Sequence, residues 1–545
     1  MNPQSSGHNA STTYTHAGIA EKAIEAPAVS PGNIVLAGPP GSGKSTLGQA
    51  LAERLSRPFL STDDEIIQQA GMSIEEIFTQ HGETFFRDME EQVCRQAAAR
   101  AGSIIACGGG ALLNERSRAA LEAYGVVLML HCETEDLLLR LQEGGRPLLG
   151  SDPAQTLPAL LEKRKEHYNS FSNTVDVSGL DLEEAVQAVL NAVKQSSIFK
   201  TKVRPDPPSQ LILGAGVMEI LDQQLGELCL EPPFVVIADS NTGPLYGELL
   251  ANQLGGTYIE FPAGEKHKTL DTLRNVYDKL YENRMERKGT IIAVGGGVVG
   301  DLAGFAAATY LRGVRWVNIS TSLLAMVDSS LGGKVAVDLP YGKNLVGAFY
   351  PPALILSDTD ALNTLPDVEF RCGMAELIKT ALIGDPLLFN SLEEEASPSI
   401  KWIERAIQVK SRIVEKDPLE KGERASLNLG HTLGHAVESA SDFKLRHGEA
   451  VAVGLLLESR IAERLGLAGQ GLSKKIEKIL LRWNLPVAFE NASPEKIVEN
   501  MKADKKNVNQ QPAFALPIRP GKVKIGIQVP QQLVLDTLAE MQEIV

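Results

Sequence analysis

Two glycine-rich segments decide the expected fold: GPPGSGKS at residues 38–45 and GGGVVGD at residues 295–301. Each follows a short apolar run, and each precedes a helical pattern. A strand, a glycine turn and a helix N-terminus in succession form a binding site for phosphate groups. Because the two patterns differ and lie far apart, the sequence predicts two nucleotide sites, and therefore two enzymes, in one chain.

The composition is that of a globular protein with more than one core. The chain has 545 residues, of which 43% are hydrophobic and 22% charged, and this length is too great for one ordinary domain. A net charge of −15 argues against nucleic acid or an anionic membrane as the main partner. No apolar run has the length of a membrane span, and the N-terminus does not resemble a secretory signal. Small-molecule substrates and a cytoplasmic location, which suits five cysteines without paired spacing, are therefore expected.

Short apolar runs alternate with amphipathic stretches over residues 31–195, which predicts a parallel sheet flanked by helices, with a helix over 44–55. Residues 1–30 have the small polar composition of a disordered tail. The proline-rich stretch 196–208 is expected to be a linker.

A second α/β domain is expected over residues 209–357, with strands at 234–238, 258–261, 290–294 and 316–320. Strand signals then fade, and residues 358–545 carry long helical patterns, which predict a mostly α-helical domain. Its clearest predicted helices cover 369–383, 400–416, 426–439 and 449–465.

The first glycine segment matches the complete P-loop pattern. Backbone N–H groups of such a loop surround the phosphates of a nucleoside triphosphate, the lysine reaches the β- and γ-phosphates, and the hydroxyl binds Mg²⁺. The residues predicted to bind ATP and Mg²⁺ are Gly41, Ser42, Gly43, Lys44, Ser45 and Thr46, with Ser45 as the metal ligand.

Residues 33–195 resemble shikimate kinases. The matching stretches include TDDEI (62–66), GETFFRDMEEQV (82–93), CGGGA (107–111), GGRPLL (144–149) and EKRKEHY (162–168). The resemblance implies that Asp63 orients the acceptor hydroxyl and that Arg87 and Arg164 hold its carboxylate, as arginine forks do well. It also implies roles for the glycine run and for two ATP-side arginines, namely Gly108, Gly109, Gly110, Arg140 and Arg146.

One position departs from the shikimate kinase pattern. Ser61 stands where the family has the first aspartate of its D-x-D motif, which supports Mg²⁺, and a serine cannot supply that charge. Compensation by Asp64 and weaker metal binding are both consistent with the sequence. Another small-molecule kinase, or an impaired kinase, remains the alternative for this domain.

The second glycine segment has the G-x-G-x-x-G pattern of dinucleotide sites, although no acidic residue follows about 20 positions later. Asp239, at the end of an earlier apolar run, is the candidate ribose partner. Three of the nine histidines are His431, His435 and His447. The spacing of the first two, one helical turn apart, nominates them as a zinc pair.

From about residue 206 onward the chain resembles 3-dehydroquinate synthases. The matching motifs include GEKHKTL (264–270), TSLLAMVDSSLGGK (321–334), CGMAELIKTALIG (372–384), LNLGHTLGHAVE (427–438) and HGEAVAVG (447–454). The resemblance implies that Zn²⁺ or Co²⁺ is bound by Glu376, His431 and His447, and it moves His435 to the substrate side. Three protein ligands leave a position for substrate, as catalytic zinc requires.

The same resemblance implies two further groups of residues. Those expected to contact NAD are Asp239, Asn241, Glu265, Lys268, Gly296, Gly297, Asp301, Thr321, Ser322 and Lys343. Those expected to contact substrate are Asp328, Lys334, Asn344, Lys379, Lys410, Arg424, Asn428, His435 and Lys505, with Arg312 reaching the phosphate site of a partner subunit in a homodimer. Lys334, Lys379, Arg424, Asn428 and His435 are the expected catalytic residues, beside Lys44, Asp63 and Arg146 in the kinase.

The expected activities are thus phosphorylation of shikimate and conversion of 3-deoxy-D-arabino-heptulosonate 7-phosphate to 3-dehydroquinate and phosphate. A metal-dependent polyol dehydrogenase and a cyclase that makes a ring without a carboxylate are the alternatives for the second half. The cations expected at the substrate, above all Lys410 and Arg424, favour a substrate that carries both a carboxylate and a phosphate.

Overall fold

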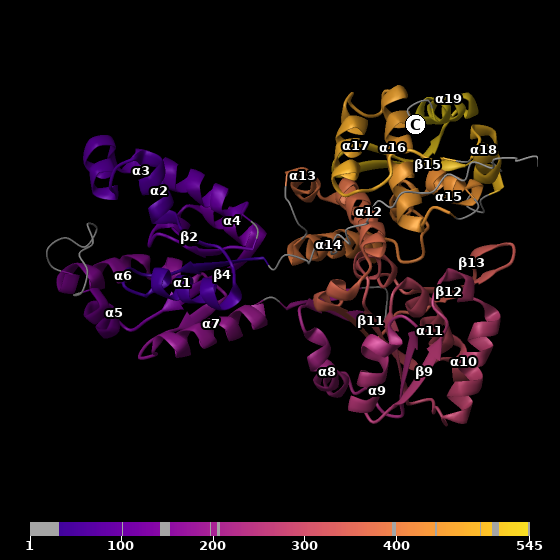
Figure 1. The fold of residues 1–545 in the computed structure, drawn as a ribbon, viewed down its shortest axis with the longest axis horizontal. Coiled ribbons are helices and arrows are strands. Elements are labelled where there is room, and N and C mark those ends of the chain that lie inside the picture. Colours follow the sequence, from indigo (N-terminus) through magenta and orange to yellow (C-terminus); the bar gives the residue numbers. More distant parts are fainter. Residues whose placement is uncertain are drawn as a thin grey trace, which may run out of the picture.

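The computed structural model describes residues 32–100, 102–141, 153–196, 198–203, 208–394, 399–441, 444–490, 492–503 and 512–542. The first unit, in indigo and purple, lies at the left of Figure 1, and the other two lie at the right. Arg146, Lys505 and the expected N-terminal tail, residues 1–30, lie outside the described residues.

The first unit contains a five-stranded parallel sheet in the order β2-β3-β1-β4-β5. Its central strand is apolar on both faces, because helices cover both. The strands are β1 (Asn33–Ala37), β2 (Phe59–Ser61), β3 (Ile104–Ala106), β4 (Gly125–His131) and β5 (Thr174–Asp176). The helices are α1 (Lys44–Leu55), α2 (Thr62–Ala70), α3 (Ile74–Ala98), α4 (Glu115–Tyr124), α5 (Thr134–Leu141), α6 (Pro153–Asn169) and α7 (Leu182–Ser196).

The second unit contains a seven-stranded sheet in the order β6-β7-β14-β11-β10-β8-β9, in which β6 alone is antiparallel to its neighbour. The strands are β6 (Phe199–Val203), β7 (Ser209–Gly214), β8 (Phe234–Asp239), β9 (Thr257–Phe261), β10 (Thr290–Gly295), β11 (Arg315–Ser320) and β14 (Leu354–Asp358). The helices are α8 (Leu221–Glu227), α9 (Glu248–Gln253), α10 (Leu270–Glu282) and α11 (Gly297–Thr309). A separate antiparallel hairpin is formed by β12 (Lys334–Leu339) and β13 (Gly342–Phe349).

The third unit is mostly helical, as predicted, and adds one antiparallel hairpin. Its helices are α12 (Asp367–Gly384), α13 (Pro386–Glu394), α14 (Ile400–Lys416), α15 (His431–Ala440), α16 (His447–Arg464), α17 (Leu472–Arg482), α18 (Pro494–Ala503) and α19 (Gln531–Gln542). The hairpin strands, which helical periodicity did not predict, are β15 (Ala513–Arg519) and β16 (Lys522–Gln528). The fold class expected from the sequence, two α/β units followed by a helical one, is confirmed.

The linker expected over residues 196–208 is partly wrong. Phe199–Val203 forms β6 and pairs along β7, from Phe199 opposite Leu213 to Val203 opposite Ser209. Val203 is 2% exposed and belongs to the main core of the C-terminal half. Because several prolines follow this strand, the composition of the segment predicted a linker and not a strand.

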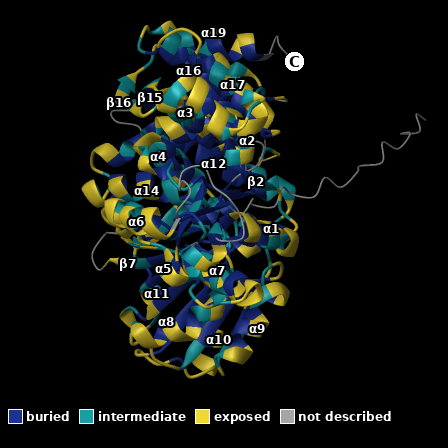
Figure 2. Ribbon diagram, turned by 90° about the vertical axis from the view of Figure 1, so that its left-hand side faces the viewer, coloured by how far each residue is buried: buried dark blue, intermediate teal, exposed yellow. Residues whose placement is uncertain are grey.

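Buried residues follow the strands and the inner helix faces, while exposed residues gather on the outer helices (Figure 2). Within the described ranges, no helix is both long and apolar enough to cross a membrane.

The cysteines give a test of this burial. At pH 8 we expect a disulfide reagent such as Ellman's to react quickly with one thiol per native chain, that of exposed Cys229. The other four are buried, and burial raises the pKa of their thiols, which keeps them protonated: Cys94, Cys107, Cys132 and Cys372. Unfolding should release all five, and Cys229→Ser should abolish the fast phase; a fast phase of two or more thiols would contradict the packing.

Candidate functional sites

The first glycine loop lies at the carboxyl end of β1 and leads directly into α1. Gly41 and Gly43 have φ of 86° and 84°, a left-handed conformation that favours glycine. The Lys44 ammonium is buried and donates to the carbonyl oxygens of Gly38 at 3.0 Å and Pro39 at 2.9 Å. Ser45 and Thr46 are exposed at the start of the helix. The loop therefore has the geometry of an anion site at a helix N-terminus.

Beside this loop, the residues expected to hold the kinase acceptor come together. Arg164 donates to the Gly109 carbonyl at 2.6 Å. A Cβ added at Gly110 would lie 3.2 Å from Arg87 Nη1 and 3.4 Å from Arg164 Nη2, and one added at Gly108 would overlap Asp63 Oδ1. The structure thus places one carboxylate and two guanidinium groups around the glycine run, which fits a ligand with a hydroxyl and a carboxylate.

Glu90 belongs to this cluster and was not predicted. It is 3% exposed and accepts from Arg87 Nη1 at 2.6 Å. Burial raises the pKa of Glu90, while the charge of Arg87 opposes that effect. Its position three residues after Arg87 on α3 was the available signal, since such residues lie on one helix face.

Ser61 serves as a helix cap in the structure. Its side chain accepts from Asp64 N at 3.3 Å and so begins α2. The Asp64 side chain is exposed, whereas Ser61 is buried. Arg140 lies near the loop, with Nη1 3.9 Å from a Cβ added at Gly43, and donates to the Val177 carbonyl.

The second glycine loop lies between β10 and α11, and a set of predicted nucleotide residues surrounds the Lys268 ammonium. This group lies 3.1 Å from Glu265, 3.1 Å from Asp301 and 2.7 Å from the Asn344 side-chain oxygen. Burial raises the pKa of Asp301 to about 6, although Lys268 opposes this. Asn344, expected at the substrate, therefore lies with the nucleotide residues.

The remaining predicted nucleotide residues are at strand ends and turns. Asp239 ends β8 and accepts from the backbone N–H groups of Asn241 and Thr242 at 3.0 and 2.9 Å, so its carboxylate shapes the turn. A Cβ added at Gly296 would lie 3.3 Å from Ser322 Oγ. Thr321 follows β11, the neighbour of β10, at the same edge of the sheet. This edge, where parallel strands end, is where dinucleotides bind in such sheets.

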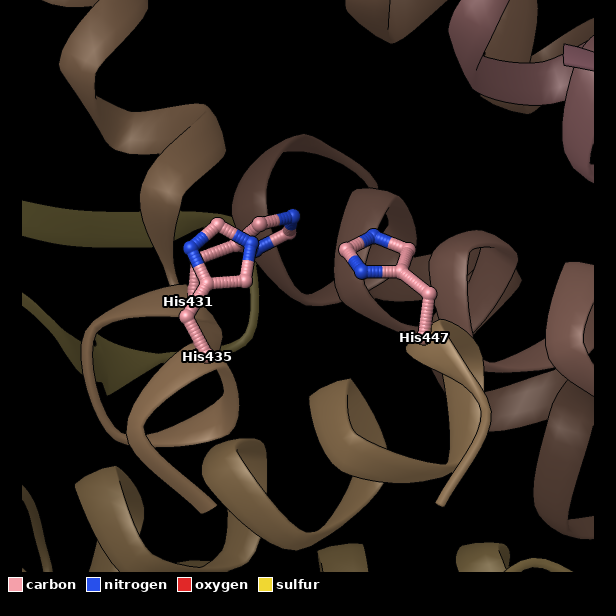
Figure 3. Close-up of side chains that lie close together, drawn as sticks. All are labelled: His431, His435 and His447. Atoms are coloured by element: carbon pink, nitrogen blue, oxygen red, sulfur yellow. The ribbon is translucent and has the colours of Figure 1, made fainter. Parts of the chain in front are cut away.

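Four predicted side chains meet at one point in the helical unit. His431 and His435 from α15 and His447 from the start of α16 face one another (Figure 3), with potential donor atoms all within 4.8 Å. Glu376 Oε1, from α12, lies 3.6 Å from His431 Nε2 and 3.4 Å from His447 Nε2. The pair expected from spacing and the triad expected from the resemblance thus share one location.

In each of the two predicted histidine ligands, Nδ1 has a partner in the protein and Nε2 faces Glu376. His431 Nδ1 lies 3.1 Å from the Leu429 carbonyl, and His447 Nδ1 lies 3.5 Å from Glu438 Oε2. Both Nε2 atoms are thereby turned toward Glu376, whose Oε1 lies 3.6 Å from His431 Nε2 and 3.4 Å from His447 Nε2 and is buried. A buried carboxylate facing two Nε2 atoms is a donor set that suits Zn²⁺ or Co²⁺.

The electrostatics favour a cation at this point. Burial alone would lower the pKa of His447, but Glu376 and Glu438 outweigh it and raise the pKa to about 9. Behind Glu376 lies Lys379, which contacts it and is 3.5 Å from Asp328 Oδ1. Lys410 donates to the same Asp328 oxygen at 2.7 Å.

Asp328 is the centre of this buried network. Burial alone would raise its pKa, but the ammonium groups of Lys379 and Lys410 hold it well below its usual range. Glu376 and Lys379 are each 1% exposed and Lys410 is 6% exposed. Buried charges of this kind persist only when paired.

The other predicted substrate residues form a neighbouring group. Arg424 is 2% exposed and donates to the Pro418 carbonyl at 2.6 Å. Glu420, which was not predicted, contacts Lys334 and accepts from Asn428 at 3.3 Å. Lys334 also lines a hollow with Asp301 beside the second glycine loop, which connects the two groups.

Two predicted residues remain. Arg312 is exposed in the short helix that follows α11, with φ of 65°. Lys343, on β13, lies 2.7 Å from Glu438. Burial raises the pKa of Glu265, but the charges of Lys268 and Lys343 outweigh it, so Lys343 lies between the histidines and the Lys268 cluster.

Comparison with known proteins identifies both halves. Residues 258–372 and 373–507 match the models of the N-terminal and C-terminal parts of 3-dehydroquinate synthase. A 3-dehydroquinate synthase of Dehalococcoides mccartyi is 41% identical over 346 residues, which are 61% of this chain and 96% of that protein. The chain belongs to the 3-dehydroquinate synthase family. Residues 40–194 match the shikimate kinase model, so the chain is a fusion of a shikimate kinase domain with a 3-dehydroquinate synthase.

Solved structures of related enzymes resemble the synthase half. A 2-deoxy-scyllo-inosose synthase complexed with carbaglucose-6-phosphate, NAD⁺ and Co²⁺ has a TM-score of 0.56 at 27% identity and covers 63% of this chain and 100% of its own. A 2-epi-5-epi-valiolone synthase from Streptomyces hygroscopicus with NAD⁺ and Zn²⁺ has a TM-score of 0.57 at 25% identity, with coverage of 64% and 100%.

A buried carboxylate holds the start of the histidine helix in this synthase. Glu458, on α16, is 0% exposed and accepts from the backbone N–H groups of Gly430 at 2.6 Å and Leu433 at 3.2 Å. The sequence indicated this buried carboxylate only by a single glutamate within the mostly apolar stretch VAVGLLLESRIA, residues 451–462.

We expect Glu458→Ala to lower the unfolding free energy of the synthase half by about 2 kcal/mol or more, because it leaves two buried N–H groups without an acceptor. Glu458→Gln keeps an acceptor oxygen and should lose less. Urea unfolding measures the loss of stability in both variants. The transition that belongs to the synthase half is identified as the one that moves to higher urea when NAD is added. Equal stability of the alanine variant and the unaltered protein would show that water replaces the carboxylate.

Proposed function

We propose that the chain catalyses two reactions of aromatic biosynthesis. The N-terminal domain transfers phosphate from ATP to shikimate, and the C-terminal half converts 3-deoxy-D-arabino-heptulosonate 7-phosphate to 3-dehydroquinate and phosphate. The observation that carries the second assignment is the convergence of Glu376, His431 and His447 near a strand-end nucleotide site.

In the kinase domain, ATP with Mg²⁺ supplies the phosphoryl group, and Ser45 is the ligand that the loop offers to the metal. Arg87 and Arg164 lie where they can hold the acceptor carboxylate, and Asp63 is placed to orient the attacking hydroxyl. Lys44 supplies positive charge at the loop. Ser61 acts as a helix cap and cannot supply the charge of the missing aspartate, whereas the exposed carboxylate of Asp64 is the acid that stands next to Asp63. An assay of ADP formation from ATP in the presence of shikimate distinguishes an active kinase from an impaired one.

In the synthase half, NAD supplies a hydride acceptor and donor, and Zn²⁺ or Co²⁺ polarises a substrate oxygen when bound. Glu376, His431 and His447 would hold the metal, and the Lys268 cluster and the second glycine loop would hold the nucleotide. His435, in the same ring of histidines, lies where it can hold a proton of the substrate. Lys334, Lys410 and Arg424 supply cations for the carboxylate and phosphate.

Two observations favour this substrate over a cyclase substrate without a carboxylate. Lys410 and Arg424 are buried cations that the resemblance assigns to the carboxylate of the substrate, and a substrate without a carboxylate would not need them. The 41% identity to a 3-dehydroquinate synthase also exceeds the 27% and 25% to the two other cyclases. The heptulosonate phosphate with NAD⁺, with and without chelator, tests this directly through released phosphate and 3-dehydroquinate.

A homodimer through the synthase half is part of the proposal. Arg312 is exposed in the short helix after α11, which suits a contact with the phosphate site of a second copy. Sedimentation of the full chain tests the oligomeric state.

The two sites should be separable by substitution. We expect Glu376→Gln to lower synthase activity by about a hundredfold or more and to weaken metal binding, since it removes the one anionic ligand. Shikimate phosphorylation should stay within about twofold of the unaltered protein. Lys44→Ala should give the reverse pattern, because the lysine charge at the phosphates is lost. Loss of both activities in either variant would argue against independent sites.

The glycine run offers a matched pair of variants in the kinase. Gly108→Ala should lower shikimate phosphorylation by about a hundredfold, because its Cβ overlaps the Asp63 carboxylate and displaces it. Gly109→Ala should have little effect, since its Cβ would lie 3.5 Å from Pro40, an ordinary contact. Steady-state kinetics with synthase activity as the folding control measures both. Equal activity of the two variants would remove Asp63 from the acceptor site.

A further inference from the structure

Glu438 is a buried carboxylate to which neither activity has assigned a task. It lies on α15, two helical turns after His431, and is 5% exposed. One oxygen, Oε2, is 3.5 Å from His447 Nδ1, and the other, Oε1, is 2.7 Å from Lys343 Nζ. A single side chain therefore contacts the metal-facing histidine and a lysine on the hairpin strand β13.

The contact with His447 determines which ring nitrogen is available. In a neutral imidazole one nitrogen carries the proton and the other is a potential ligand. A carboxylate at Nδ1 favours the proton there and leaves the Nε2 lone pair, which faces Glu376 at 3.4 Å. His431 achieves the same arrangement with the Leu429 carbonyl, so both Nε2 atoms point to one place.

The contact with Lys343 fixes a long cationic side chain at the same time. Lys343 is 38% exposed, and without an anchor its ammonium would sample many positions. The opposite charges of Glu438 and Lys343 hold the hairpin strand against the histidine helix at this point. Burial alone would raise the pKa of Glu438, but His447 and Lys343 outweigh it and hold the pKa at about 2.

We propose that Glu438 is a positioning residue that holds His447 with Nε2 toward the metal and Lys343 toward the nicotinamide nucleotide. This inference rests on the proposed synthase function. Glu438 contacts neither ligand itself; it acts through one residue of each site.

The test measures binding of Co²⁺ alone and of NAD⁺ alone to the full chain. Glu438→Ala should weaken Co²⁺ binding, measured by chelator competition and by the visible absorption of Co²⁺, by about 10- to 100-fold. It should also weaken NAD⁺ binding, measured by calorimetry, by about threefold or more, since an unanchored lysine loses more freedom on binding. Glu438→Gln keeps an oxygen for Nδ1–H and should restore part of the Co²⁺ affinity.

Two further variants separate positioning from loss of charge. Lys343→Met should weaken NAD⁺ binding and change Co²⁺ affinity by less than about threefold. Glu449→Gln removes a nearby charge of α16 that accepts from Arg446 N, and it should leave both affinities within the same range. Circular dichroism and urea unfolding of the synthase half establish that each variant is folded.

The outcomes are distinguishable. Co²⁺ affinity of Glu438→Ala within threefold of the unaltered chain would overturn the role at His447, and unchanged NAD⁺ affinity would overturn the role at Lys343. If Glu376→Gln also leaves Co²⁺ affinity unchanged, the proposed metal site itself fails. If only Glu376→Gln weakens it, the metal site stands and Glu438 has no part in it.

Discussion

The pairing of buried charges is the constraint on which the synthase half depends. Glu376 and Lys379 are both 1% exposed, and an isolated ion in such a place would be strongly unfavourable. Asp328 lies within reach of Lys379 and Lys410, and Glu376 lies between Lys379 and two imidazoles. The network comes from η7 (Ala325–Ser329), α12, α14, α15 and α16, so these elements must pack in one arrangement for the charges to meet. The same arrangement leaves the Glu376 carboxylate facing His431 and His447.

Both halves place their ligand-binding residues where parallel strands end. In the kinase domain the loops after β1, β2 and β3 bring Lys44, Asp63 and the glycine run together, because these strands are neighbours in the sheet. In the synthase, the turns after β8, β10 and β11 are adjacent for the same reason. The helical unit, which lies above the seven-stranded sheet in Figure 1, then adds the metal-facing side chains from α12, α15 and α16. Residues that are far apart along the chain therefore lie close together, because the strands that precede them are neighbours in the sheet.

Much of this arrangement could be predicted from the sequence, and the remainder has a physical explanation. The amphipathic pattern gave α1 and α14 with the bounds that the structure shows, and the P-loop pattern located the first site. Periodicity alone suggested a His431–His435 pair, and only the family resemblance placed Glu376 beside His431 and His447. Glu90, Glu438 and Glu458 were not predicted because glutamate is usually exposed on helices, and only the packing shows which glutamates are buried.

Strand β6 bears on how the fusion is held together. Helix α7 ends at Ser196 and β6 begins at Phe199, so the last kinase helix leads almost directly into the edge of the synthase sheet. An engineered synthase that starts at residue 208 would lose this border strand, leave β7 with unpaired backbone groups and remove Val203 from the core. The structural boundary between the two enzymes therefore lies upstream of the proline-rich stretch, and the segment that joins them is itself part of the second enzyme.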